Sequence, residues 1–298
     1  MSELYTPVLD AHRRAVEEAL PDYLPVGNLP QATVMRAMQY ACSEGGKRLR
    51  PVLTLEFCRL CCGETERAMP FAAAVEMIHS YSLVHDDLPC MDNSPMRRGK
   101  PSVHAAFGED MALLAGDGLL NLAFETMLDP ARRAGVPAER ALSAAFTLAK
   151  GSGIYGMVGG QVIDLESEGH AIGFDLLRVL QEGKTAALIA AACEMGCIIG
   201  GGGQKQTAAA QRFGIHLGLC FQMIDDILDV TSTPEQLGKP VGSDATNEKT
   251  TYVSLLGLDE VRRLAEEHTA AAVLALKAFK RDTTDLRTLA DRLLSRSR

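Results

Sequence analysis

Two clusters of carboxylates stand far apart in the chain, and each lies beside strongly apolar sequence. The first is in "SLVHDDLPCMDNSPMRRGKPS" and the second in "FQMIDDILDV". Two like charges about 4 Å apart repel by roughly 1 kcal/mol in water and roughly 4 kcal/mol at an effective dielectric constant of 20. Such clusters at the ends of buried helices therefore require cations. The six carboxylates are Asp86, Asp87, Asp92, Asp225, Asp226 and Asp229.

The ligand types in the two clusters favour Mg²⁺. Neither "DDLPCMD" nor "DDILD" contains a histidine, so both offer oxygen ligands alone. Mg²⁺ prefers oxygen and is commonly held by a few carboxylates, waters and substrate phosphates together. Asp225 and Asp229 are four residues apart and share one face of a helix. The alternative is a solvated acidic surface, but the core-like neighbours "MIHSYSLVH" and "GLCFQMI" favour a metal site.

Basic residues in five further motifs supply the opposite charge. The motifs are "GGKRLRP", "MRRGKP", "EGKTA", "LGKPVG" and "NEKTTY". Arginine forks match phosphate oxygens, and lysine adds a point charge. Each cation alone would be an ordinary surface charge. Together with the carboxylates, they predict a site for diphosphate esters, with aliphatic helices holding an apolar tail.

The hydrophobic pattern predicts an all-α fold, a single-domain helical bundle over residues 1–298. Apolar residues recur at spacings of three and four, and alternating strand patterns are scarce. Pro70 fits the start of one helix and Pro89 lies just past its end, so Asp92 should return from an irregular loop. The predicted helices are 70–87, 108–128, 176–200 and 206–230, with turns at 130–137, 200–203 and 231–242.

Composition disfavours nucleic-acid binding and a membrane span, and it favours a cytoplasmic location. The net charge of −8 disfavours nucleic acid, which is bound mainly through basic contacts to phosphate. No uninterrupted apolar run reaches the roughly 18 residues of a membrane span. The N-terminal segment lacks the apolar region of a signal peptide, so the eight cysteines are expected to be free thiols in a cytoplasmic protein.

Three cysteines in "CRLCC" allow two interpretations. They could belong to a metal site, but no second thiol pair stands at the spacing of a zinc ribbon. Cys58, Cys61 and Cys62 fall at i, i+3 and i+4, which favours one face of a helix packed into a core.

The order of these motifs resembles the short-chain trans-polyprenyl diphosphate synthases, and most of all the bacterial farnesyl diphosphate synthases. The resemblance runs from "GGKRLRP" through "DDLPCMD", "GQVIDL", "KTAAL", "FQMIDDILDV" and "LGKPVGSD" to "EKTTY". It implies an all-helical fold around a deep central cavity, a homodimer, and about three Mg²⁺ ions per active site. It also implies condensation of isopentenyl diphosphate with dimethylallyl or geranyl diphosphate to give farnesyl diphosphate.

The resemblance also implies roles for individual residues. Metal binding falls to Asp86, Asp92 and Asp225, while the other three carboxylates bind less directly or support them. Catalysis and allylic binding fall to Lys184, Thr185, Gln222 and Lys239, with Arg97 and Lys249. Isopentenyl diphosphate binding falls to Gly46, Lys47, Arg50, His79 and Arg98. Without the resemblance, His79 would be interpreted as a histidine packed in the core. The segment Asn93–Met96 differs from many relatives, which carry further acidic residues there.

Product length is expected to depend on Tyr81 and Ser82. A helix rises about 1.5 Å per residue, which places them roughly 7.5 and 6 Å from Asp86 along the axis. An aromatic ring there can act as a floor under the growing tail, and in the resembling family it accompanies the fifteen-carbon product. Geranylgeranyl or geranyl diphosphate remains the alternative, with a floor built elsewhere, for example at 113–120, or with Tyr81 merely packed in the core.

Other classes of protein fit the motifs less well. A class I terpene cyclase shares the ionisation chemistry but needs no second-substrate pocket, and its second metal motif is usually not DDxxD. A non-catalytic partner subunit would be expected to have lost an aspartate motif. A purely structural metal-binding bundle would leave the distributed cations unexplained.

Overall fold

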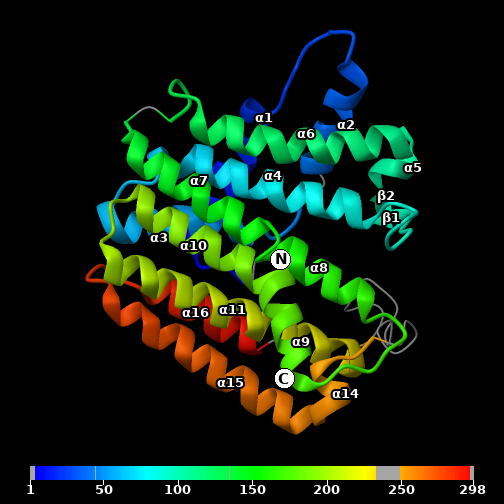
Figure 1. The fold of residues 1–298 in the computed structure, drawn as a ribbon. Helices are drawn as coiled ribbons and strands as arrows, with labels where there is room; N and C mark the ends of the chain where they lie inside the picture. Colours follow the sequence, from blue (N-terminus) through cyan, green and yellow to red (C-terminus); the bar gives the residue numbers. More distant parts are fainter. Residues whose placement is uncertain (1–3, 44, 134, 233–248, 296–298) are drawn as a thin grey trace.

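A computed structural model describes residues 4–43, 45–133, 135–232 and 249–295 of the chain, and these residues confirm the predicted all-α class (Figure 1). Strand structure in these ranges is confined to a hairpin of two short strands, β1 (Met96–Arg97) and β2 (Lys100–Pro101). The helices are α1 (Pro7–Tyr23), α2 (Ala32–Ser43), α3 (Leu49–Cys62), α4 (Met69–Asp86), α5 (Val103–Phe107), α6 (Glu109–Leu128), α7 (Ala138–Ser152), α8 (Met157–Glu166), α9 (Phe174–Gln181), α10 (Ala187–Ile199), α11 (Gln204–Thr231), α14 (Tyr252–Leu256), α15 (Leu258–Ala275) and α16 (Thr284–Ser295). Shorter turns are η1 (Glu66–Ala68), η2 (Glu182–Ala186) and η3 (Leu276–Ala278).

The long helices stack in layers. From top to bottom in Figure 1, α6 lies on α4, α10 and α11 follow below, and α15 closes the lower side. Helix α10 is the central element, because it packs against α3, α7 and α11 at once. This arrangement requires a helix that is apolar on nearly every side.

The sequence of α10 meets that requirement. It reads "ALIAAACEMGCII" and buries almost all of its residues. Leu188 and Met195 join the core formed with α4 and α6, whereas Ile189 and Cys193 join the core formed with α3 and α11. A helix that is hydrophobic all round is stable only when it is surrounded in this way.

Most predicted helix boundaries are confirmed. Helix α4 has Pro70 in its first turn and ends before Pro89, and α6 and α11 cover the predicted segments 108–128 and 206–230. The segment 176–200 differs from the expected single helix, because a π-helical turn, Glu182–Ala186, separates α9 from α10. Single π-helical turns of this kind are frequent at functional sites.

Helix α6 qualifies the sequence argument about membranes. Among the described residues, it alone is long and apolar enough on average to cross a bilayer, although no uninterrupted apolar run of that length exists. The helix carries Glu109, Asp110, Asp117 and Glu125, and it packs along α4 and α2. Packing in the bundle therefore buries part of its apolar surface, while Leu113 and Leu114 remain exposed.

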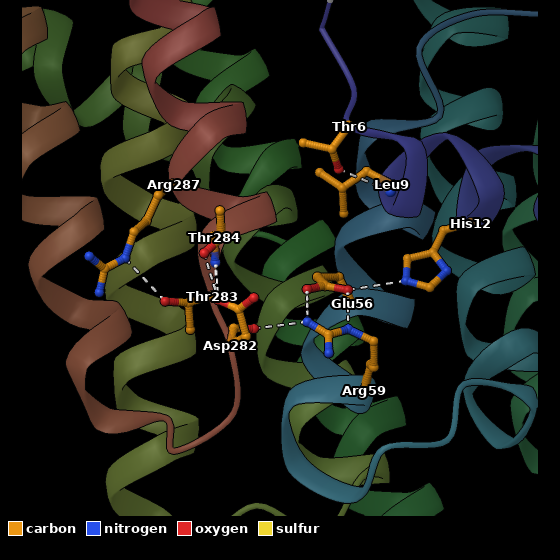
Figure 2. A network of polar contacts seen from close by, with 9 residues as sticks. All are labelled: Thr6, Leu9, His12, Glu56, Arg59, Asp282, Thr283, Thr284 and Arg287. Atoms are coloured by element: carbon orange, nitrogen blue, oxygen red, sulfur yellow. Dashed lines mark hydrogen bonds and ion pairs between the residues drawn. The ribbon is translucent and has the colours of Figure 1, made fainter.

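A polar network fixes the C-terminal half of α3. Glu56 is fully buried and accepts hydrogen bonds from His12 of α1 at 3.1 Å and from Arg59 at 2.6 and 2.8 Å (Figure 2). Burial alone would raise the pKa of Glu56, but Arg59 and His12 hold that pKa below its usual value. Arg59 also donates to the backbone carbonyl of Asp282, just before α16, at 2.9 Å. The network therefore joins both ends of the described chain to α3.

Candidate active site

A cavity of about 380 Å³ between α4, α8 and the π-helical turn gathers many of the predicted site residues. It contains residues assigned to both substrates, to metal binding and to chain length, which come from positions between 50 and 185 in the sequence. The predicted residues in its wall are Arg50, His79, Tyr81, Ser82, Asp86, Lys184 and Thr185.

Helix α4 supplies four of these side chains from consecutive turns. Asp86 is its last residue, and His79, Tyr81 and Ser82 precede it. The Ser82 hydroxyl donates to the carbonyl of His79 at 2.9 Å, so it stays folded against the helix. The Tyr81 ring is 7% exposed and lies edge-on to His85, with ring centroids 5.8 Å apart. One helix thus sets the distance between the carboxylate and the aromatic ring.

Asp87 and Arg97 form a paired unit beside the cavity. Asp87 is buried, and Arg97 donates to it from Nη2 at 2.5 Å and from Nε at 3.1 Å. The hairpin holds Arg97 in place through a two-residue turn at Arg98 and Gly99, both with positive φ. Such turns suit the twist of short hairpins. Asp87 therefore neutralises a cation that the resemblance assigns to the allylic substrate.

Several residues assigned to isopentenyl diphosphate lie close to one another, and Arg50 and His79 among them line the cavity. The Arg98 guanidinium donates to the Gly45 carbonyl and lies over Gly46, where an added Cβ would be 2.7 Å from Nη1. Arg50 presents a buried Nε with no partner among the described residues, and burial lowers its pKa to about 10. Burial, followed by Arg50 and Arg98, holds the pKa of His79 well below its usual value, so this ring is neutral.

Lys47 and Arg48, which follow Gly46 in the chain, make contacts of other kinds. Arg48 is buried and paired with Glu76 at 2.5 Å, while its other nitrogen donates to the Cys42 carbonyl at 2.6 Å. Arg48 therefore anchors the loop rather than facing a ligand. The Lys47 ammonium lies 4.6 Å from the centre of the Phe221 ring, next to Gln222.

Glycines let two helices hold the π-helical turn from opposite sides. A Cβ at Gly160 of α8 would lie 2.1 Å from the Lys184 backbone nitrogen, and one at Gly218 of α11 would lie 2.6 Å from the Ala186 Cα. Contacts this short are possible only because both residues lack a side chain. The backbone that carries Lys184 and Thr185 is therefore clamped between α8 and α11.

A second, smaller cavity of about 160 Å³ shares Lys184 with the first and contains Gln222, Asp226 and Lys249. Asp164 of "GQVIDL" accepts from Lys184 at 2.6 Å and from Lys249 at 3.4 Å. Burial alone would raise the pKa of Asp164, but the two lysines hold it below its usual value. Asp164 was given no role from the sequence, because its link to both lysines exists only in the fold.

The second aspartate cluster lies at the end of α11, on the wall beside this smaller cavity. Asp226 is buried and accepts from the backbone N–H of Tyr252 at 2.8 Å, and Asp229 is also buried. Asp225 is partly exposed. These contacts give Asp226 a place in holding α14 against α11.

The sequence motifs assigned no role to several residues of the cavity wall, and one assigned residue lies outside the described residues. Helix α8 contributes Met157, Val162 and Leu165 to the apolar wall, and the buried Gln161 Nε2 has no partner among the described residues. The glutamine in "GQVIDL" was visible in the sequence, but nothing there showed that it points into the cavity. Lys239 lies outside the described residues.

The carboxylates fit Mg²⁺ by their chemistry. Burial raises the pKa of Asp86 to about 6, and although Lys184 opposes this, Asp92 adds to it. A divalent cation would relieve that repulsion. The described part of the chain contains no group of three or more Asp, Glu, His or Cys side chains poised to hold a metal unaided. This fits the usual habit of Mg²⁺, which completes its shell with waters and substrate phosphates.

The fold and the site together define a helical prenyltransferase. The polyprenyl synthetase family model matches residues 31–288, and the chain belongs to that family. It is 47% identical over 253 residues to "Putative geranylgeranyl pyrophosphate synthase 8, chloroplastic" of Arabidopsis thaliana, covering 84% of this chain and 70% of the relative. It is 44% identical over 266 residues to the farnesyl diphosphate synthase of Geobacillus stearothermophilus, covering 89% and 88%.

A solved structure supports the same fold. The geranyltransferase of Helicobacter pylori, complexed with magnesium and isoprenyl diphosphate, superposes with a TM-score of 0.82 at 31% identity and covers 97% of each chain. The predicted isoprenoid-synthase-like bundle is therefore confirmed.

Gly160→Ala should lower turnover by about 10- to 100-fold, because the new Cβ forces α8 away from the turn that carries Lys184, and displacements near 1 Å can cost this much. Gly173→Ala, where an added Cβ meets nothing within 4 Å, is the matched control. Steady-state kinetics and circular dichroism would be compared for both variants. Equal turnover in Gly160→Ala and the control would contradict the clamp.

Proposed function

We propose that the chain is a cytoplasmic, Mg²⁺-dependent synthase, one domain over residues 1–298, that makes farnesyl diphosphate from isopentenyl diphosphate and dimethylallyl or geranyl diphosphate. The observation that supports it best is the shared cavity: Arg50 and His79 enter it near Asp86, Lys184 and Thr185. A terpene cyclase would need Asp86, Lys184 and Thr185 but not Arg50 and His79, because it binds no second substrate. The eight free cysteines support a reducing compartment.

Asp86, Asp92 and Asp225 are the proposed metal ligands, in a family that depends on Mg²⁺. When bound, three Mg²⁺ ions would neutralise the diphosphate leaving group of the allylic substrate. Lys184, Lys249 and Lys239 would add positive charge where negative charge develops. Arg97 would turn from Asp87 toward the same phosphates.

The remaining residues position the second substrate and protect the reaction. Gly46, Lys47, Arg50 and Arg98 would hold isopentenyl diphosphate, with neutral His79 donating or accepting a hydrogen bond. Thr185 and Gln222 would direct their dipoles toward the allylic carbocation, and the apolar residues of α4 and α8 would exclude water from it. The double bond of isopentenyl diphosphate then attacks, and no protein base is assigned to the departing proton.

Incubation with labelled isopentenyl diphosphate and each allylic primer tests this function. Asp86→Asn should lower turnover at least about 100-fold with the fold intact, because charge stabilisation in the transition state is lost. Asp259→Asn, a fully exposed carboxylate on α15, is the control. Near-native activity of Asp86→Asn at ordinary Mg²⁺ concentrations would remove Asp86 from the metal site.

The proposed fifteen-carbon product rests on Tyr81. Relatives of similar identity carry farnesyl and geranylgeranyl names, so overall similarity does not decide between them. Tyr81 is large, buried and in the cavity wall five residues before Asp86, and most of the remaining apolar lining comes from α8. Its phenol ring therefore fits a floor under the growing chain.

Tyr81→Ala should shift the products toward twenty carbons or more, because the smaller side chain deepens the cavity. Chain length would be measured by chromatography of the dephosphorylated products. Ser82→Ala changes little volume at the neighbouring position and serves as the control. If Tyr81→Ala still stops at fifteen carbons, the floor lies elsewhere.

We further propose that two copies of the chain associate through α7 and the segment after it. Phe146, Ile154 and Tyr155 are 71%, 63% and 87% exposed and line a hollow of about 560 Å³ that is separate from the substrate cavities. Leu142 extends the same helix face and is 60% exposed. Exposed apolar patches of this kind mark interaction surfaces.

Light scattering should give twice the 32.0 kDa mass of one chain. Phe146→Glu with Tyr155→Glu should shift this mass to that of the monomer, because two charges would be buried in the interface. Val26→Glu, at an equally exposed position between α1 and α2, should leave the dimer intact. A monomeric wild type would disprove this interface.

A further inference from the structure

Two thiols from distant parts of the chain touch at the opposite end of the bundle from the active site. The Sγ atoms of Cys61 on α3 and Cys197 on α10 are 3.3 Å apart, although 136 positions separate them in sequence. They stand 11 and 12 residues beyond Arg50 and Thr185, which is roughly 16 to 18 Å along their helices. The pair therefore takes no direct part in binding substrates.

Close backbone contact between α3 and α10 creates this pair. A Cβ at Gly196 would lie 2.1 Å from the Thr54 carbonyl oxygen, and one at Gly200 would lie 2.7 Å from the Cys61 Cβ. These glycines flank Cys197 and let the two backbones approach within direct contact. The polar network of Glu56 and Arg59 fixes the same end of α3 from the other side.

The loop after α10 also makes room for the two sulfurs. A Cβ at Gly202 would lie 2.3 Å from the Cys197 Sγ and 2.9 Å from the Cys61 Sγ. Thr207 donates a weak hydrogen bond to the Cys197 Sγ at 3.7 Å. Any other residue at position 202 would push the thiols apart or the loop away.

Neighbouring cysteines do not form an equivalent pair. The Cys58 and Cys62 Sγ atoms are 3.7 Å apart, but both residues lie on α3 four positions apart. Cβ atoms at that spacing are about 5 to 6 Å apart, whereas a disulfide needs about 3.5 to 4.5 Å. A metal centre is also disfavoured, since the described residues contain no cluster of three or more metal-ligating side chains.

The pKa values of the two thiols are shifted in opposite directions. The hydrogen bond from Cys61 lowers the pKa of Cys197, although burial opposes this and Thr207 assists it. The same hydrogen bond, followed by burial, raises the pKa of Cys61. Cys197 is fully buried and Cys61 is partly exposed, so an oxidant from solvent meets Cys61 first.

We propose that Cys61 and Cys197 form a reversible dithiol–disulfide site that is oxidised by hydroperoxides. Cys197 first releases its proton to water, and Cys61 then passes its own proton to the Cys197 thiolate across their contact, so that the Cys61 thiolate attacks a peroxide oxygen. The O–O bond breaks, Cys61 becomes a sulfenic acid, and the leaving hydroxide takes up a proton to become water. The Cys197 sulfur then attacks the Cys61 sulfur and expels hydroxide, which takes the Cys197 proton. Two thiols and one hydrogen peroxide thus give one disulfide and two waters.

The disulfide should stabilise the fold and spare the active site. It closes a long loop in the unfolded chain, and such cross-links raise the free energy of unfolding chiefly by restricting that state. The S–S bond is about 2.05 Å, so the sulfurs need to approach by only a little more than 1 Å. Such a movement at the far ends of α3 and α10 leaves the cavity unchanged.

Peptide mass spectrometry tests the site directly. The full-length protein would be treated with hydrogen peroxide at neutral pH, alkylated, and digested without reduction. The expected product is a peptide pair linked through Cys61 and Cys197, lighter by two hydrogens and released by dithiothreitol. The melting temperature should rise by at least about 3 °C, with turnover unchanged. Oxidation confined to the exposed Cys90, or a link between Cys58 and Cys62 instead, would overturn the proposal.

Two variants sharpen the assignment. Cys197→Ser should abolish the link, because no second thiol remains at this contact to accept the Cys61 proton and to attack the Cys61 sulfur. Cys58→Ser is the matched control on the same helix and should retain the link in full. Loss of the link in Cys58→Ser, or a link that persists in Cys197→Ser, would show that the pairing is wrong. The wild-type peptide map decides the matter even if one variant fails to fold.

Discussion

The structure depends on balancing charge inside a partly buried site. Taking an ion out of water costs several kcal/mol unless a partner compensates it. Arg97 forms an ion pair with Asp87, and Lys184 and Lys249 both donate hydrogen bonds to Asp164. A diphosphate entering under the proposed function would take over these cations and leave carboxylates exposed to one another. That exchange is the physical reason why the proposed site would bind Mg²⁺ and diphosphate together.

Arg50, unlike Arg97, Lys184 and Lys249, has no carboxylate partner in the described part of the chain, and this shows how the two proposed pockets differ. Its Nε is buried without a partner among the described residues, and burial lowers its pKa. An unpaired buried donor is costly unless a ligand satisfies it. Arg50 can therefore accept an anion without breaking an ion pair of its own, since Glu76 acts on it only from a distance, whereas Arg97 and Lys184 must first give up their carboxylate partners. The difference fits one substrate that needs metal ions and one that does not.

The sequence predicted the helices well and the contacts between them poorly. Pro70 and Pro89 marked α4, and Asp86 and Lys184, which the sequence assigned to one site, both line one cavity in the structure. The π-helical turn was missed, because the apolar pattern continues on both sides of Glu182–Ala186 and a single interior glycine, Gly183, does not specify a π-helical turn. Asp164 shows the same limit, since its link to two lysines depends on how α8, η2 and the segment before α14 meet.

Glycine positions explain why these contacts could not be read from composition. Gly160 and Gly218 clamp the turn at one end of α10, and Gly196 and Gly200 bring α3 against its other end. Gly160, Gly196 and Gly218 are interior glycines, each of which weakens its helix by about 1 kcal/mol relative to alanine, and Gly200 caps the end of α10. In the fold, each removes a Cβ that would force two backbones apart. Helix α10 therefore has the turn that carries Lys184 and Thr185 at one end and the contact of Cys197 with Cys61 at the other, and direct backbone contact fixes both ends.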